Sequence, residues 1–173
     1  MFDDFKELLS AFNAHSVKYL VVGGYAVSFH AQPRSTNDLD VFIKADAANA
    51  RAAYAALASF GAPLGGLKLE DLADPRKFIR FGHPPVAIDL LPGIDGVSFD
   101  EAWERRVETL IDPERGLSAY FISKTDLIAS KLEAGRMRDL RSGGHDGGRG
   151  CGGGRGEKIA SLDFHGSSLK RLL

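Results

Sequence analysis

The first part of the chain alternates between helical and strand-like spacing of its apolar residues. Residues 2–14 place apolar side chains at helical spacing, whereas residues 17–22 form a short apolar segment that leads into a glycine pair. A short helix is predicted over residues 25–31, followed by a loop over residues 32–37. Residues 38–44 begin with alternating polar and apolar positions, which is typical of a strand with one buried face. The chain therefore opens as helix, strand, short helix and strand.

The same mixture of periodicities continues along the chain to about residue 140. Pro84 and Pro85 separate two apolar segments that are expected to pair as a hairpin. Ser123 is placed to cap the last helix of this part. Helices are predicted over residues 46–60, 99–106 and 123–134, and strands over residues 77–81, 86–91 and 119–122.

The composition narrows the class of protein. With 173 residues and 44% hydrophobic content, the chain is long enough for one compact domain with a sizeable core. The 22 basic and 23 acidic residues leave a formal charge of -1, so a nucleic acid would have to be held by a local patch. The single cysteine excludes an internal disulfide, and neither a signal peptide nor a membrane-spanning run is found. We expect a cytoplasmic protein without membrane contact.

Glycine and arginine dominate residues 141–156, a composition that cannot bury a core. We therefore expect a domain over residues 1–140 and a disordered tail over residues 141–173, with at most a weak helix near its end. Three arginines of the tail could bind RNA weakly, although no aromatic residue lies between them. A frame disruption or truncation of the source gene explains this composition at least as well.

Two aspartates lie one residue apart in the predicted strand at residues 38–44. Because side chains alternate along a strand, Asp38 and Asp40 point the same way, roughly 7 Å apart. Magnesium takes few protein ligands and completes its shell with phosphate oxygens and water, so two carboxylates plus a triphosphate suit it. Gly23 and Gly24 allow a tight turn close to a ligand, and the following helix offers N–H groups to phosphate. The alternatives are a solvent-facing edge strand and an ordinary turn between strand and helix.

A third acid, Asp89, lies in the predicted strand at residues 86–91, on the face opposite its large apolar side chains. It could equally be a polar residue that faces solvent. The glycine pair, the Asp38-Leu39-Asp40 motif and this later aspartate together resemble the signature of the DNA polymerase beta-like nucleotidyltransferase superfamily. The similarity is fairly specific, because it combines a turn and three acids at set places along the chain.

The similarity extends to the bacterial branch that contains abortive-infection toxins of the AbiEii type, and it covers residues 15 to 140. It implies an α+β nucleotidyltransferase fold, resembling an α/β sandwich, in which helices flank a mixed β-sheet. The segments that carry it are Gly24-Tyr25-Ala26-Val27, Arg34-Ser35-Thr36-Asn37-Asp38-Leu39-Asp40, Ile88-Asp89-Leu90-Leu91, Lys131-Leu132-Glu133-Ala134 and Arg138-Asp139-Leu140.

The resemblance also implies roles for individual residues. Asp38, Asp40 and Asp89 would bind two Mg²⁺ ions, or Mn²⁺ in their place, one on the triphosphate and one on the attacking hydroxyl. Asp89 would also help to deprotonate that hydroxyl. Lys131 would contact the triphosphate, with Asp139 as an orienting partner. These assignments make the three aspartates both the catalytic residues and the metal ligands.

Further polar residues are candidates for contacts with the nucleotide. Lys124 lies seven residues before Lys131 and nearly on the same helix face, so either could reach phosphate. Arg34, Ser35 and Thr36 directly precede the aspartate strand, although such residues more often satisfy loop backbone. The predicted nucleotide-binding residues are Gly23, Gly24, Arg34, Ser35, Thr36 and Lys131.

These features predict a magnesium-dependent nucleotidyltransferase. It would move a nucleoside monophosphate from a nucleoside triphosphate such as ATP to a hydroxyl on a protein, a tRNA or other RNA, or a small molecule. The resemblance adds a toxin–antitoxin role with a cognate antitoxin or other partner protein. The alternative is a non-catalytic nucleotidyltransferase-like binding module or an inactive, truncated relative. Related chains usually continue past residue 140 with more helix, so the acceptor is not predicted.

Overall fold

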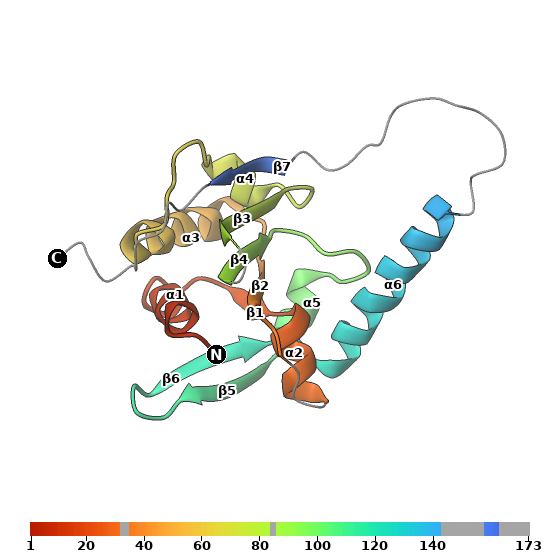
Figure 1. The fold of residues 1–173 in the computed structure, drawn as a ribbon, viewed down its shortest axis with the longest axis horizontal. Helices are drawn as coiled ribbons and strands as arrows, with labels where there is room; N and C mark the ends of the chain where they lie inside the picture. Colours follow the sequence, from red (N-terminus) through yellow and green to blue (C-terminus); the bar gives the residue numbers. More distant parts are fainter. Residues whose placement is uncertain (32–34, 84–85, 143–157, 163–173) are drawn as a thin grey trace.

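The computed structural model describes residues 1–31, 35–83, 86–142 and 158–162 (Figure 1). Helices and strands are interspersed along the described residues. The helices are α1 (Asp3–Ala14), α2 (Gly23–His30), α3 (Ala47–Phe60), α4 (Leu69–Ala73), α5 (Phe99–Glu104) and α6 (Lys124–Ser142). The strands are β1 (Tyr19–Val21), β2 (Asp38–Ile43), β3 (Phe78–His83), β4 (Val86–Leu91), β5 (Val107–Asp112), β6 (Leu117–Phe121) and β7 (Lys158–Leu162).

The strands form one mixed sheet in the order β5-β6-β1-β2-β4-β3-β7. Neighbours along the chain pair antiparallel in β1–β2, β3–β4 and β5–β6, whereas β1–β6, β2–β4 and β3–β7 are parallel. The long connection between β2 and β4 contains α3, which allows these two strands to run parallel. The structure thus confirms the predicted α+β fold, a mixed sheet with flanking helices.

Helices cover the sheet from both sides (Figure 1). α1 and α3 pack against each other, and α6 lies on the opposite side of the molecule from α3 (Figure 1). α5 packs on the sheet through the edge-to-face contact of Phe99 with Phe42 in β2, whose ring centroids are 4.9 Å apart. The sheet therefore has one face under α1 and α3 and another that carries Asp38, Asp40 and Phe42.

The core is built from the apolar positions that the sequence pattern identifies. α1 is amphipathic, and its buried positions are Phe5, Leu8, Leu9 and Phe12. In β2 the residues Leu39, Val41 and Ile43 are fully buried. Burying an aliphatic or aromatic side chain of this size stabilises a fold by about 1.5–3 kcal/mol, so this face of β2 is firmly anchored. An anchored β2 also fixes the direction of the two aspartates on its other face.

Three elements differ from the sequence-based expectation. β5 and α4 were not predicted, because β5 is an edge strand with mostly exposed side chains and α4 is a single short turn of helix. β7 forms within the segment expected to be a disordered tail, where it pairs with the edge of β3. An unpaired strand edge offers free backbone N–H and C=O groups, a partner that local periodicity does not reveal. The boundary at residue 140 stays a prediction, since α6 continues to Ser142 and residues 143–157 and 163–173 lie outside the described residues.

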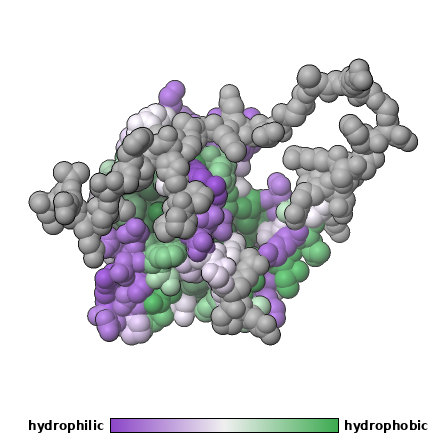
Figure 2. All heavy atoms as spheres, in the orientation of Figure 1, coloured by the Kyte–Doolittle hydropathy of each residue, from purple (hydrophilic) through white to green (hydrophobic). Residues whose placement is uncertain are grey.

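None of the described helices is long and apolar enough to cross a membrane. Among the α6 residues whose side chains are described, Ile128 and Leu132 are large, apolar and exposed, and hydrophobic surface is visible around this helix in Figure 2.

Candidate active site

Strand register brings the two predicted acid motifs together. Asp40 of β2 lies opposite Asp89 of the parallel strand β4, and Asp89 in turn lies opposite Arg80 of β3. Side chains at paired positions of neighbouring strands point to the same face of the sheet. Asp38 is two residues before Asp40 and so shares this face. The four side chains form what we call the acid cluster: Asp38, Asp40, Asp89 and Arg80.

The glycine turn packs directly against Asp40. Gly23 has a φ of +59°, in the left-handed region, and a Cβ at this position would collide with the Asp40 carboxylate. The Gly24 N–H donates a hydrogen bond to that carboxylate, and a Cβ on Gly24 would collide with the Thr36 side chain. The Val22 N–H donates to the Asp40 carbonyl at 2.9 Å. The turn between β1 and α2 therefore requires glycine because the backbone approaches the acid cluster so closely.

The surroundings of Asp40 disfavour its charge. Burial raises the pKa of the Asp40 carboxyl, and the neighbouring charges of Asp89 and Asp38 raise it further. The Gly24 N–H and the positive charge of Arg80 oppose this shift. A carboxylate held among like charges is relieved by any added cation. The cluster thus has an electrostatic reason to bind positive charge.

Arg80 is a site residue that the sequence analysis missed. Its Nε and Nη2 atoms each donate to one oxygen of Asp89, both at 2.6 Å, and Nη2 lies 4.0 Å from an Asp38 oxygen. The hydrogen bonds to Asp89 raise the pKa of Arg80, and the charges of all three aspartates add to this. A signal was present, because Arg80 and Asp89 lie equally far from Pro84 and Pro85 in the predicted hairpin. Pairing positions across that hairpin would have placed them side by side.

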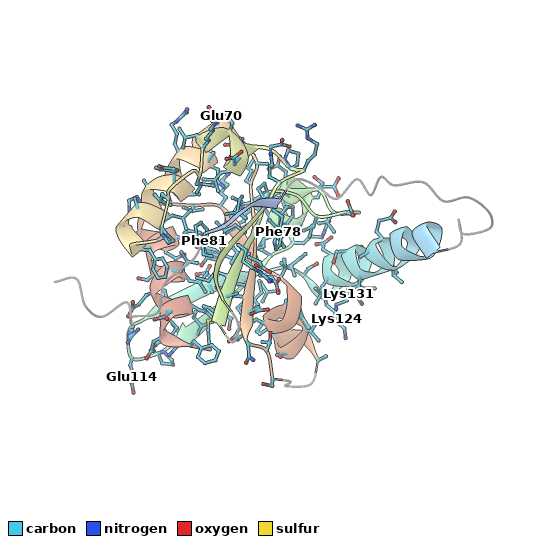
Figure 3. The ribbon with its side chains drawn as sticks, turned by 45° about the horizontal axis from the view of Figure 1, so that its top comes forward. Glu70, Phe78, Phe81, Glu114, Lys124 and Lys131 are labelled. Atoms are coloured by element: carbon cyan, nitrogen blue, oxygen red, sulfur yellow. The ribbon has the colours of Figure 1, made fainter. Side chains whose placement is uncertain are left out.

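A cleft of about 580 Å³ opens beside Asp40 and Gly23. α6 lines it at helical spacing with Leu127, Ser130, Lys131 and Ala134. The other wall comes from the segment before β3, with Arg76 and Lys77, and from the loop after β4, with Gly93 and Asp95. Lys131 thus lines the same cavity as Asp40, whereas Lys124 is not among the lining residues. Both lysines are labelled on α6 in Figure 3.

The predicted nucleotide-binding residues do not all reach this cleft. Ser35 and Thr36 line a separate hollow of about 360 Å³, together with Tyr25 and Ser28. The Thr36 hydroxyl donates to the backbone carbonyl of Asp38 at 3.4 Å. Such a hydrogen bond to loop backbone is the alternative to nucleotide binding that the sequence analysis gives for this residue. Arg34 lies outside the described residues, and no side chain of Asp139 is described. Of the predicted set, Gly23 and Lys131 lie in the wall of the cleft that contains Asp40.

The donor atoms of the cluster are of the kind that Mg²⁺ prefers, since all three acids offer carboxylate oxygens. Asp38 and Asp40 are partly exposed, whereas Asp89 is 5% exposed and directs both oxygens at Arg80. Within the described ranges no three acidic, histidine or cysteine side chains surround one point closely enough to hold an ion. The residues therefore fit a metal at the Asp38–Asp40 pair, and Asp89 is committed to a guanidinium in this conformation.

Helices flanking a mixed sheet, with a glycine turn beside strand-borne acids, define a nucleotidyltransferase-like protein. The family model described as "Nucleotidyltransferase of unknown function (DUF6036)" matches residues 1–142, and the chain belongs to this family. This confirms the resemblance to the nucleotidyltransferase superfamily, while the resemblance to AbiEii-type toxins stays a prediction.

The fold also matches a solved structure. The crystal structure of a candidate nucleotidyltransferase (TM1012) from Thermotoga maritima is similar with a TM-score of 0.56 and 11% sequence identity. The alignment covers 80% of this chain and 86% of that one. At this level of identity the likeness concerns the fold alone. Among curated proteins no sequence matches this chain.

Proposed function

We propose that this protein is a magnesium-dependent nucleotidyltransferase that moves a nucleoside monophosphate from a nucleoside triphosphate to a hydroxyl acceptor. The observation that carries the proposal is one cleft whose wall contains Asp40, the glycine turn against it and Lys131. Family membership supports the reaction class, and the cleft supports a nucleotide site beside Asp40. A protein, an RNA or a small molecule could supply the hydroxyl.

The residues of the cleft have distinct parts in this reaction. Asp38 and Asp40 would hold Mg²⁺, which when bound neutralises charge on the phosphoryl oxygens and the departing pyrophosphate. Lys131 would pair with the triphosphate across the cleft from Gly23. The Gly23 turn holds Asp40 in place through backbone contact, so the carboxylate needs little reorganisation. Asp89 would help to accept the proton of the attacking hydroxyl, provided that Arg80 leaves one of its oxygens accessible.

The first experiment measures magnesium-dependent transfer of label from each α-labelled nucleoside triphosphate. The acceptors offered are the protein itself, total tRNA and common aminoglycosides. Wild-type protein should transfer label, and the Asp38→Ala/Asp40→Ala variant should not, because its metal-holding pair is gone. Equal transfer by both proteins would contradict the assignment.

A matched pair of lysine variants tests the nucleotide site separately. Lys131→Ala should weaken triphosphate binding by about tenfold, the value of one charge-assisted contact, measured by calorimetry. Lys124→Ala, on the same helix but outside the cleft wall, should bind as wild type does. Equal effects of the two changes would place the nucleotide elsewhere.

The pairing of Asp89 with Arg80 favours a second candidate, a non-catalytic binding module. Such a module would bind a nucleotide or a partner protein, such as a cognate antitoxin, without transferring label. Binding of that partner should then survive in the Asp38→Ala/Asp40→Ala variant. Transfer by the wild type alone would exclude this candidate.

A further inference from the structure

Arg80 occupies the position that a cation would take next to Asp89. Its guanidinium uses both oxygens of a carboxylate whose side chain is only 6% exposed, so little room is left there for another ligand. The same Nη2 atom lies 4.0 Å from Asp38. Arg80 thus contacts two of the three acids of the acid cluster, Asp89 and Asp38.

The arginine is placed so that it could leave Asp89. Its side chain is 38% exposed, and its guanidinium lies 5.7 Å from the centre of the Phe78 ring at the start of β3. Phe78 also lines the cleft that contains Asp40 and Lys131. A guanidinium pairs with phosphate through the same two-armed geometry that it uses with carboxylate. A polyanion bound in the cleft would therefore compete with Asp89 for Arg80.

We propose that Arg80 is a positioning residue that holds Asp89 in place of a second divalent cation. In the nucleotide-free protein, Asp38 and Asp40 take one divalent cation, and Asp89 becomes a ligand for a second only when the guanidinium moves to a bound polyphosphate. Arg80 thereby couples the second cation to the presence of the nucleotide. This inference rests on the proposed function, because it concerns the same acids.

The test measures how many Mn²⁺ ions the nucleotide-free chain binds and how tightly. The electron paramagnetic resonance signal of free Mn²⁺ is the readout. Wild type should bind one ion tightly. Arg80→Gln should bind a second ion as well, with an affinity at least about tenfold higher than wild type has for a second ion, because the positive charge near the aspartates has been removed. Arg80→Lys, which keeps the charge but loses the two-armed contact, should lie between them.

Arg105→Gln is the matched control. Arg105 makes the same two-armed contact through Nε and Nη2, but with Asp126 at the beginning of α6, and neither residue lines the cleft that contains Asp40. This variant should bind Mn²⁺ as wild type does, so any effect of merely losing an arginine–aspartate pair is measured separately. In Asp89→Asn protein, adding Arg80→Gln should change the affinity little, since the ligand that Arg80 covers is already missing.

The outcomes separate this inference from the proposed function. If wild type binds Mn²⁺ and Arg80→Gln binds no further ion and no more tightly, Arg80 only supports Asp89 and the inference is wrong. If no variant binds Mn²⁺, both the inference and the metal part of the proposed function are wrong. Addition of a non-hydrolysable triphosphate should raise the Mn²⁺ count of wild type but leave that of Arg80→Gln nearly unchanged once the Mn²⁺ bound by the nucleotide alone is subtracted.

Discussion

Two arginine–aspartate pairs in this protein have nearly the same geometry and very different neighbours. Arg80 donates to both oxygens of Asp89 at 2.6 Å, and Arg105 donates to those of Asp126 at 3.1 and 2.7 Å. Both acids have side chains less than a tenth exposed. Asp126 gains a further donor in the Ser123 hydroxyl at 2.6 Å, whereas Asp89 lies opposite another acid in the sheet.

The difference shows how the surroundings determine what an ion pair does. Around Asp126 the Arg105 hydrogen bonds, with help from Ser123, outweigh the effect of burial and hold the pKa of the carboxyl below its ordinary value. Around Asp89 the neighbouring Asp40 and Asp38 leave an excess of negative charge that one arginine cannot cancel. The first pair fixes the beginning of α6. In our proposal, the second pair separates when nucleotide binds, and a divalent cation then replaces Arg80 at Asp89.

The largest contrast should come from removing the two acids. Asp126→Ala should lower the free energy of unfolding by about 2–3 kcal/mol, because it breaks a buried pair and removes the Ser123 contact. Asp89→Ala should lower it by about 1 kcal/mol or less, since the loss of the Arg80 pair is offset by relief of repulsion with Asp40. Urea denaturation of each variant without divalent ions measures both.

Glu114→Ala provides the baseline for these measurements. Glu114 is exposed in the turn between β5 and β6 (Figure 3), and its removal should change the unfolding free energy by less than about 0.5 kcal/mol. Equal losses for Asp126→Ala and Asp89→Ala would mean that the two pairs are both structural.

A pair of glycine variants sharpens the same contrast. Gly23 and Gly116 have φ values of +59° and +61°, but a Cβ would meet the Asp40 carboxylate at Gly23 and open space at Gly116. Each change to alanine should destabilise the fold by about 1–2 kcal/mol through backbone strain. Only Gly23→Ala should also weaken Mn²⁺ binding, because it displaces Asp40. Unchanged Mn²⁺ binding in Gly23→Ala would show that the turn does not position the acid.

The smallest expected effect is a difference in pH dependence. The pKa of Asp126 is lowered in the folded protein, so its contribution to stability is complete above the unfolded-state pKa and is lost as pH falls through the folded value. The pKa of Asp40 is raised, so the folded protein instead gains stability as pH falls through that raised value. Asp126→Asn should therefore be less stable than wild type at neutral pH, and Asp40→Asn more stable.

The Asp40→Asn difference should shrink as the pH falls through the raised folded pKa of Asp40 toward the ordinary carboxyl value of about 4. The Asp126→Asn difference should shrink only below that value, as the pH falls through the lowered folded pKa of Asp126. Urea midpoints measured in the presence of a chelator, from neutral pH downward, follow this convergence. A destabilised Asp40→Asn variant at neutral pH would contradict the view that the acid cluster carries uncompensated charge.

Local periodicity predicted those parts of the fold that are decided within a few residues. α1, α3 and β2 begin and end close to the predicted residues, because burial alternates along each element with its own period. β5 was missed because its side chains are mostly exposed, and β7 was missed because it pairs with a strand far away in sequence.

The sequence by itself determined that Asp38 and Asp40 share one face of a strand and that a glycine turn precedes them, since both follow from local backbone geometry. Tertiary structure alone decided that Asp40 lies beside Asp89 and that Lys131, but not Lys124, lines the cleft. It also brought Arg80 to the acids, although the hairpin already paired that residue with Asp89. The reason is that β2 and β4 pair in parallel across a long connection, and a parallel register is set by packing of the whole sheet rather than by neighbouring residues.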